Sequence, residues 1–143
     1  MTTFKAKYLA KKFNLTGKND IEEALVDMYA DQITDLLNEC NELVRAKFAS
    51  DKEREKRSQE RLEVAWPKNL GFFEKRLKDN KSGFLVGSGL TWADLHLYAV
   101  LDWLFERKSE VIQNFPLVKS LADRIESMPN IAKWLAERPK SAL

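Results

Sequence analysis

Three aspartates, Asp27, Asp31 and Asp35, stand four residues apart in a stretch whose apolar residues recur at helical spacing. Four-residue steps place side chains on one helix face, so the pattern predicts a stripe of carboxylates opposite the apolar face. Like charges at this spacing destabilise a helix by about 0.2–0.5 kcal/mol per pair, and a cationic partner relieves that cost. The partner is either a Lys or Arg from elsewhere in the fold or a positively charged group of a ligand. The spacing alone leaves both open.

A further carboxylate, Asp94, stands in the stretch GSGLTWADL, where it either acts on a substrate or helps to start a helix. The spacing favours the helix start, because Thr91 and Asp94 fit the N-cap and third positions of a capping box. In that arrangement the Thr91 hydroxyl accepts from the Asp94 amide, and the Asp94 carboxylate accepts from the Thr91 amide. The glycines do not form a phosphate-binding loop, since no strand precedes them and no Gly-Lys-Ser/Thr follows.

The two other side chains with metal-binding or nucleophilic chemistry have simpler interpretations. His96 is the only histidine, and no cysteine or carboxylate stands at a metal-ligand spacing from it. Cys40 is the only cysteine and lies on the apolar face of a predicted helix, which indicates an inert core thiol. The sequence therefore predicts no metal site.

Composition excludes several classes of protein. The chain has 143 residues, of which 44% are hydrophobic and 32% charged, as is typical of one folded domain. The net charge of +2 is too close to neutral to indicate a nucleic-acid partner. No apolar run approaches the roughly 20 residues of a membrane span, and the first residues lack the apolar core of a secretory signal. A lone cysteine fits a reducing compartment, so we predict a cytoplasmic protein without a membrane partner.

The elements that must position these residues are predicted to be helices throughout, since few glycines and prolines interrupt helical patterns. A short helix over 4–13 precedes two long helices, over 20–48 and 51–77. Asp20 is the expected N-cap of the first long helix. Pro67 removes one backbone donor from the second and predicts a kink there.

A capped helix over 92–107 carries apolar residues on most of its circumference. Such a helix is mostly buried, so we predict that it forms the centre of the bundle. Two further helices follow, opened by Pro116 and Pro129, because proline is favoured in a first helical turn. The fold class is therefore all-α, with two long helices and a buried, capped central helix.

Several stretches resemble the C-terminal domain of cytosolic glutathione transferases, above all the sigma class and its nematode and arthropod relatives. GFLVGSGLTWADL is similar to the segment that opens the buried central helix of that domain. YLAKKFNLTGKNDIEEALVDMYADQITDL is similar to its junction and first long helix, and FPLVKSLADRIESMPNIAKWLAERPKSAL to its C-terminal end. The resemblance implies a glutathione transferase C-terminal-domain-like helical bundle.

The resemblance also implies a division of the chain. Residues 1–14 look like a remnant of the third helix of the thioredoxin-like domain that precedes the helical domain in this family. Residues 15–143 match the helical domain itself. The tyrosine or serine that activates the glutathione thiol belongs to the thioredoxin-like domain and has no counterpart in the sequence. We therefore expect no catalytic residue in this chain, and no cofactor beyond glutathione as co-substrate.

The family suggests roles for individual residues. In sigma-like transferases an aspartate matching Asp35 reaches the glutathione amino group across the dimer interface, and Asp31 is a second candidate on the same face. By the same resemblance, Tyr29, Leu37 and Leu143 are candidates for lining an electrophile pocket. The implied partners are glutathione and hydrophobic electrophiles, once an N-terminal domain is present, and a second copy in a homodimer.

Two functions of different classes remain open. In the first, the chain is the helical domain of a glutathione transferase, supplies the electrophile pocket and dimer contacts, and is inactive alone. In the second, it is a non-catalytic protein-binding or scaffold module, as helical domains of this family are in translation factors and synthetase complexes. A thioredoxin-like domain encoded upstream would favour the first function over the second.

Overall fold

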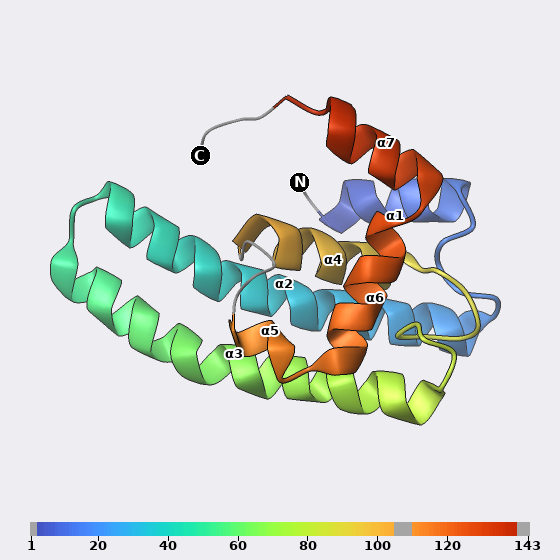
Figure 1. The fold of residues 1–143 in the computed structure, drawn as a ribbon, viewed down its shortest axis with the longest axis horizontal. Helices are drawn as coiled ribbons and strands as arrows, with labels where there is room; N and C mark the ends of the chain where they lie inside the picture. Colours follow the sequence, from blue (N-terminus) through green and yellow to red (C-terminus); the bar gives the residue numbers. More distant parts are fainter. Residues whose placement is uncertain (1–2, 105–109, 140–143) are drawn as a thin grey trace.

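The computed structural model describes residues 3–104 and 110–139, and every regular element within them is a helix (Figure 1). The helices are α1 (Thr3–Lys12), α2 (Asp20–Phe48), α3 (Lys52–Asn80), α4 (Trp92–Leu104), α5 (Glu110–Gln113), α6 (Pro116–Glu126) and α7 (Pro129–Glu137). The predicted all-α fold is therefore confirmed. In this described part of the chain, no helix is both long enough and apolar enough to cross a membrane.

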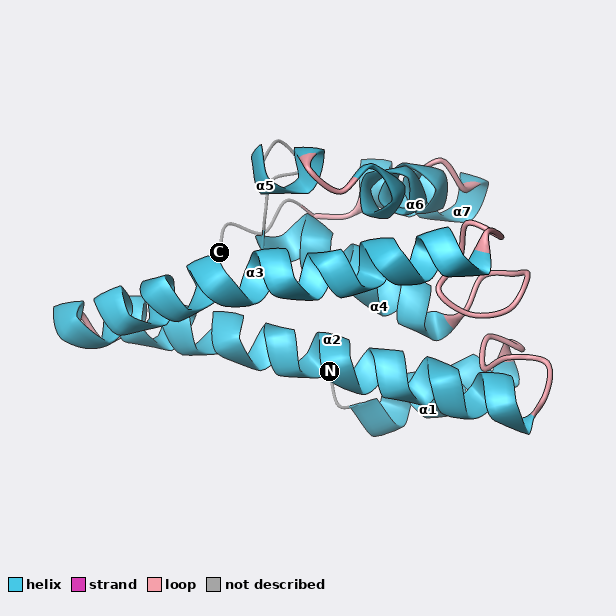
Figure 2. Ribbon diagram, turned by 90° about the horizontal axis from the view of Figure 1, so that it is seen from below, coloured by secondary structure: helices cyan, strands magenta, loops and turns pink. Residues whose placement is uncertain are grey.

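The long helices α2 and α3 form an antiparallel pair whose tip extends beyond the other helices (Figure 1). Ile33 and Leu36 of α2 and Leu70 and Phe73 of α3 are buried in the core. Figure 2 shows α1 on the outer side of α2, and α6 and α7 on the opposite side of the molecule, beyond α3. Between these layers, α4 packs against α1, α2 and α6, so it is the central helix that the sequence predicted.

The cap of α2 lies one residue earlier than predicted. Asn19, rather than Asp20, is the N-cap residue, and its side-chain oxygen accepts from the Glu22 amide at 2.9 Å. The Glu22 carboxylate accepts from the backbone amide of Lys18 at 2.8 Å. These reciprocal bonds satisfy backbone donors that the helix itself cannot pair. Asp20 instead contributes negative charge to the first turn, where the helix dipole favours it.

Helix α3 continues through Pro67 and ends at Asn80 rather than at residue 77. Figure 1 shows that its axis bends gently along its length, so the missing donor of Pro67 is accommodated without ending the helix. Lys81 then adopts a left-handed φ of 56° and stops the helix. The Asn80 side-chain amide donates to the carbonyls of Phe84 and Gly87, both at 2.8 Å, and so shapes the following loop.

The start of α4 is held by Asp94, which is fully buried. Its carboxylate accepts from the Thr91 amide at 2.8 Å, as the capping box predicted. The Thr91 hydroxyl differs from the prediction, because it donates to the same carboxylate at 2.7 Å instead of accepting from the Asp94 amide. A third bond, unforeseen from the sequence, comes from the Leu85 amide at 2.8 Å. Asp94 therefore ties together the helix start and the loop before it.

Two arginines fasten this loop to the neighbouring helices. Arg76 of α3 donates to the Leu85 carbonyl at 2.7 Å. Arg124 of α6 donates to the Gly83 carbonyl at 2.8 Å and lies 5.2 Å from the centre of the Phe84 ring. A Cβ at Gly83 would meet the Arg124 guanidinium, so only glycine leaves room for this contact. The loop is thus fixed from α3, α4 and α6 at once.

Helix α6 receives its N-terminal cap from another helix. Its N-cap residue, Phe115, makes no side-chain capping bond. The Glu74 carboxylate of α3 instead accepts from the amides of Leu117 and Val118, at 3.0 and 2.9 Å. A carboxylate at this end also complements the helix dipole, which favours negative charge there. The short α5 was not predicted, and residues 105–107, the expected end of α4, lie outside the described residues.

Replacing Asp94 by alanine should lower the free energy of unfolding by about 2–4 kcal/mol, because the amides of Leu85 and Thr91 would be left buried without acceptors. Thermal or urea unfolding measures the change. The matched control is Asp123→Ala on the exposed side of α6, which should change stability by less than about 0.5 kcal/mol. Equal effects of the two substitutions would show that Asp94 does not anchor the loop.

Candidate functional site

Helix α4 presents two different faces. Ala93, Asp94, Leu97, Tyr98 and Leu101 are buried in the core. A second stripe also repeats at helical spacing and consists of Trp92, Leu95, His96, Ala99 and Val100. Its middle residues are half-buried or exposed, so this side of α4 is not covered as fully as the apolar sequence suggested.

Helix α1 lies against this second stripe through its small residues. Ala10 is buried and Ala6 is partly buried against the core, and alanine lets two helix backbones approach closely. The Trp92 amide donates to the Leu15 carbonyl at 2.9 Å, which joins the α1–α2 linker to the first turn of α4. Lys7 of α1 pairs with Asp27 of α2 at 2.9 Å. These contacts fix the position of α1 on the bundle.

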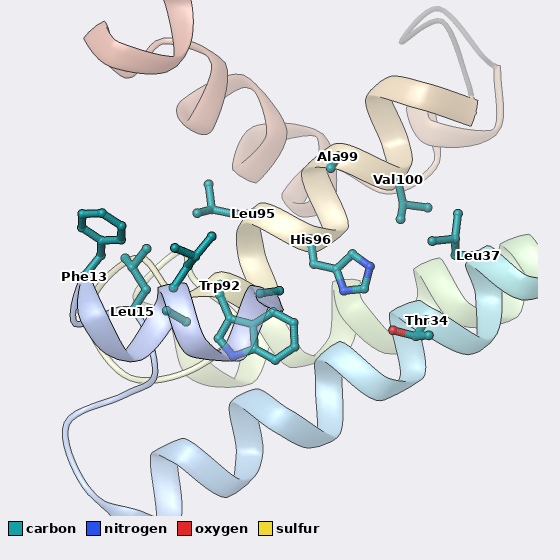
Figure 3. Close-up of a pocket in the computed structure, with 12 residues that line it drawn as sticks. Phe13, Leu15, Thr34, Leu37, Trp92, Leu95, His96, Ala99 and Val100 are labelled. Carbon is teal, nitrogen blue, oxygen red and sulfur yellow. The ribbon is translucent and has the colours of Figure 1, made fainter. Parts of the chain in front are cut away.

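An open cavity of about 450 Å³ remains between α1, α2 and α4, and we call it the α1–α2–α4 cavity. It is lined by Ala6, Leu9, Ala10, Phe13, Leu15, Thr34, Leu37, Trp92, Leu95, His96, Ala99 and Val100. Figure 3 shows these side chains from α1, α2 and α4, with His96 and Val100 on the side of α4 that faces α2. Sites for small molecules typically have volumes of about 300–1,000 Å³ and apolar walls, so both the size and the lining suit an apolar ligand.

His96 brings a titratable group to this apolar wall. Its ring is stacked on the Trp92 indole, with 6.0 Å between ring centres and 13° between planes. Burial lowers the pKa of the His96 imidazole below its ordinary value, so the ring is neutral near pH 7. Its Nδ1 atom is enclosed without a hydrogen-bond partner. The apolar pattern predicted a mostly buried helix around His96, although the four-residue spacing of His96 from Trp92 and Val100 already placed all three on one stripe.

One of the three aspartates of the carboxylate stripe on α2 has a cationic partner from the fold. Asp27 is paired with Lys7, and this hydrogen bond is the main cause that raises the pKa of Lys7, with a smaller contribution from the nearby charge of Asp31. Asp31 and Asp35 are exposed, and neither forms an ion pair with another described residue. Lys7 therefore neutralises Asp27, the first aspartate of the stripe, whereas Asp35, the last one, is exposed to solvent.

The three residues expected to line an electrophile pocket do not share one place. Leu37 lines the α1–α2–α4 cavity. Tyr29 points toward α3, where its ring lies 6.5 Å from that of Phe73 and under the Arg76 guanidinium at 5.7 Å. It is not among the cavity-lining residues. Leu143 lies outside the described residues.

The remaining reactive groups have no arrangement for chemistry in the described part of the chain. Cys40 is buried, and burial raises the pKa of its thiol to about 11, so the nucleophilic thiolate is rare at neutral pH. No cluster of three or more His, Cys, Asp or Glu side chains within the described residues is placed to hold a metal ion. The cavity is lined in part by α2, the helix that also carries the exposed Asp31 and Asp35.

Comparison with known proteins identifies the family. Residues 35–138 match the family model described as "Glutathione S-transferase, C-terminal domain". This match covers most of the chain, and it includes α4, α6 and α7 together with most of the α2–α3 pair. The chain therefore belongs to the family of glutathione S-transferase C-terminal domains.

Individual relatives agree with this assignment. The chain is 38% identical over 133 residues to glutathione S-transferase 3 of Gallus gallus. It is 37% identical over 137 residues to probable glutathione S-transferase 6 of Caenorhabditis elegans. These alignments include 93% and 94% of this chain but only 57% and 66% of the two relatives. The relatives are thus considerably longer than this sequence.

Solved structures show the same fold. NaGST-2 has a TM-score of 0.83 and 35% identity, and the match covers 98% of this chain and 69% of that one. Prostaglandin synthase D of Nilaparvata lugens has a TM-score of 0.87 at 27% identity, covering 99% and 69%. Na-GST-3 of Necator americanus, which is described as monomeric, has a TM-score of 0.84 at 33% identity, covering 96% and 67%.

Proposed function

We propose that this chain is the helical domain of a sigma-like glutathione transferase and that it provides the binding site for the electrophile. The α1–α2–α4 cavity carries this proposal, because it is an apolar hollow of ligand size in a member of this family. A domain acting only as a scaffold needs no such hollow. The reaction class is conjugation or isomerisation with glutathione in the cytoplasm.

The exposed aspartates support a place for glutathione next to the cavity. On α2, helical spacing places Thr34 between the cavity residue Leu37 and the carboxylate stripe. Asp35 is exposed and has no ion-pair partner among the described residues, so its carboxylate is available to the ammonium group of glutathione. Asp31 lies one turn away, but its charge already interacts with that of Lys7. Asp35 is therefore the stronger candidate.

The thiol-activating group is proposed to come from a thioredoxin-like domain, and residues 1–14 are proposed to be a remnant of the third helix of that domain. Glutathione reacts well near neutral pH only when a positioned donor lowers the pKa of its thiol. No tyrosine, serine, lysine or arginine is among the described residues that line the cavity. Of the lining side chains that carry a polar hydrogen, Trp92 Nε1 is enclosed, and the Thr34 hydroxyl donates to the Ala30 carbonyl at 2.9 Å. Tyr29 and Leu143 remain candidates for completing the electrophile pocket in the assembled enzyme.

We expect residues 1–143 alone to give no appreciable turnover of a chlorinated nitrobenzene with glutathione. Fusing residues 1–143 to the part of a longer relative that lies outside the alignment should restore turnover. One such relative is the C. elegans protein, of which the alignment covers 66%. In the joined protein Asp35→Asn should raise KM for glutathione about tenfold, because a bond to a charged group contributes about 1.5–3 kcal/mol. Asp31→Asn, at the weaker candidate, should raise KM less than Asp35→Asn does. The matched control is Asp123→Asn on the exposed side of α6, which should change KM less than twofold.

Two outcomes would contradict this proposal. Turnover by residues 1–143 alone, at the rate of an intact transferase, would mean that an activating hydroxyl exists within the chain. A well-folded joined protein that binds neither glutathione nor the nitrobenzene would instead favour the scaffold function.

We also propose that the chain forms a homodimer through the outer faces of α2 and α3. Val64 and Phe72 are 71% and 51% exposed on α3, beside a groove that has both basic and acidic walls. The groove contains Arg57, Lys68 and Glu60. A surface with both signs of charge can pair with a second copy of itself across a two-fold axis. The relative Na-GST-3, which is described as monomeric, shows that the fold alone does not determine the oligomeric state.

Sedimentation at micromolar concentration should give a mass close to twice 16.6 kDa. Phe72→Ser should shift the protein toward monomer, since burying a large apolar side chain contributes about 1.5–3 kcal/mol for each of the two Phe72 side chains in the interface. The matched control is Phe4→Ser, which removes an 80% exposed side chain from α1 and should leave the dimer intact. A wild-type monomer would refute the dimer, and a shift with Phe4→Ser alone would place the contact on α1.

A further inference from the structure

The α1–α2–α4 cavity has very few polar atoms on its wall. Three of its lining side chains carry a nitrogen or oxygen: Thr34, Trp92 and His96. The Thr34 hydroxyl already donates to the Ala30 carbonyl at 2.9 Å. Trp92 is only 5% exposed, and its Nε1 atom is closed off from the cavity. The imidazole of His96 is therefore the remaining side chain that can donate to a molecule in the cavity.

The two ring nitrogens of His96 differ in their surroundings. Nδ1 is enclosed without a partner, whereas Nε2 is not enclosed in this way. Figure 3 shows the nitrogen-bearing edge of the ring turned toward the side of α2 that carries Thr34 and Leu37. An enclosed N–H without an acceptor is rarer in proteins than an enclosed acceptor without a donor. The neutral ring should therefore keep its proton on Nε2 and point a donor into an otherwise apolar space.

We propose that the His96 Nε2–H group is the polar anchor of this cavity, which binds small apolar molecules carrying one hydrogen-bond acceptor, such as a ketone carbonyl. Three features of the cavity support this role: a volume of about 450 Å³, a mostly apolar wall, and one available donor. If the cavity holds the electrophile as proposed above, His96 selects electrophiles whose acceptor lies next to an apolar body. Binding itself requires no glutathione.

A matched pair of unreactive ligands tests the proposal on residues 1–143. Acetophenone and α-methylstyrene have nearly the same shape but differ in a C=O against a C=CH₂ group. Because His96 is the only histidine, its imidazole ¹⁵N signals in an NMR titration are unambiguous. The free protein should show the proton on Nε2. Acetophenone should shift the Nε2 signal, whereas α-methylstyrene should shift cavity amides such as those of Leu37 and Val100 but leave Nε2 nearly unchanged.

Substitution separates the hydrogen bond from the hydrophobic part of binding. His96→Phe keeps a flat ring and removes both nitrogens, so it should weaken acetophenone binding about fivefold relative to α-methylstyrene, which corresponds to one net hydrogen bond. Thr34→Val is the matched control on the facing helix and should change this ratio less than twofold. Should His96→Phe fail to fold, the wild-type ¹⁵N shifts remain a complete test.

Several outcomes would overturn the proposal. If His96→Phe weakened the binding of acetophenone and of α-methylstyrene by the same factor, the ring would act by its shape alone. An Nε2 signal unmoved by acetophenone would mean that water or the protein satisfies this donor. Absence of shifts at Leu37 and Val100 with either ligand would mean that the cavity holds no small molecule. None of these results depends on the transferase assay, so this proposal and the catalytic one can fail separately.

Discussion

The buried carboxylate of Asp94 fixes the element on which both the core and the cavity depend. It accepts from the amides of Leu85 and Thr91 and from the Thr91 hydroxyl, so the loop before α4 and the first turn of α4 move as one unit. Burial raises the pKa of this carboxyl group, while its hydrogen bonds act in the opposite direction. One face of the helix so placed completes the core, and the other forms the wall of the α1–α2–α4 cavity.

The sequence predicted the features of the fold that depend on neighbouring residues. Helical periodicity and the spacing of Thr91 and Asp94 are local signals, and they correctly placed the long helices and the capped central helix. The hydrogen bond from the Leu85 amide to Asp94 spans nine residues, and the one from the Leu117 amide to Glu74 spans forty-three. No local sequence pattern could predict either bond. The Thr91 hydroxyl donates rather than accepts because the Asp94 carboxylate, which also accepts from the Leu85 amide, lies next to it.

The candidate site was less predictable for a physical reason. A helix that is apolar on most of its circumference suggests burial on every side, yet α4 is covered by the core on one face and only partly by α1 on the other. Family resemblance proposed Leu37 and Tyr29 together, but their eight-residue separation on α2 leaves Leu37 at the cavity and Tyr29 at α3. The importance of His96 depends on which ring atom is enclosed, and only the packing of three helices determines that.

Amide hydrogen exchange of Leu85 and Thr91 tests most directly whether Asp94 holds the loop and α4 together. Both amides donate to this buried carboxylate, so they should open only when the core around Leu97 opens, and exchange as slowly as the core amides. Deuterium uptake followed by NMR resolves each amide separately. Protection of the Leu85 and Thr91 amides should be close to that of the Leu97 amide. Exchange as fast as that of Ser88, in the exposed part of the same loop, would contradict it.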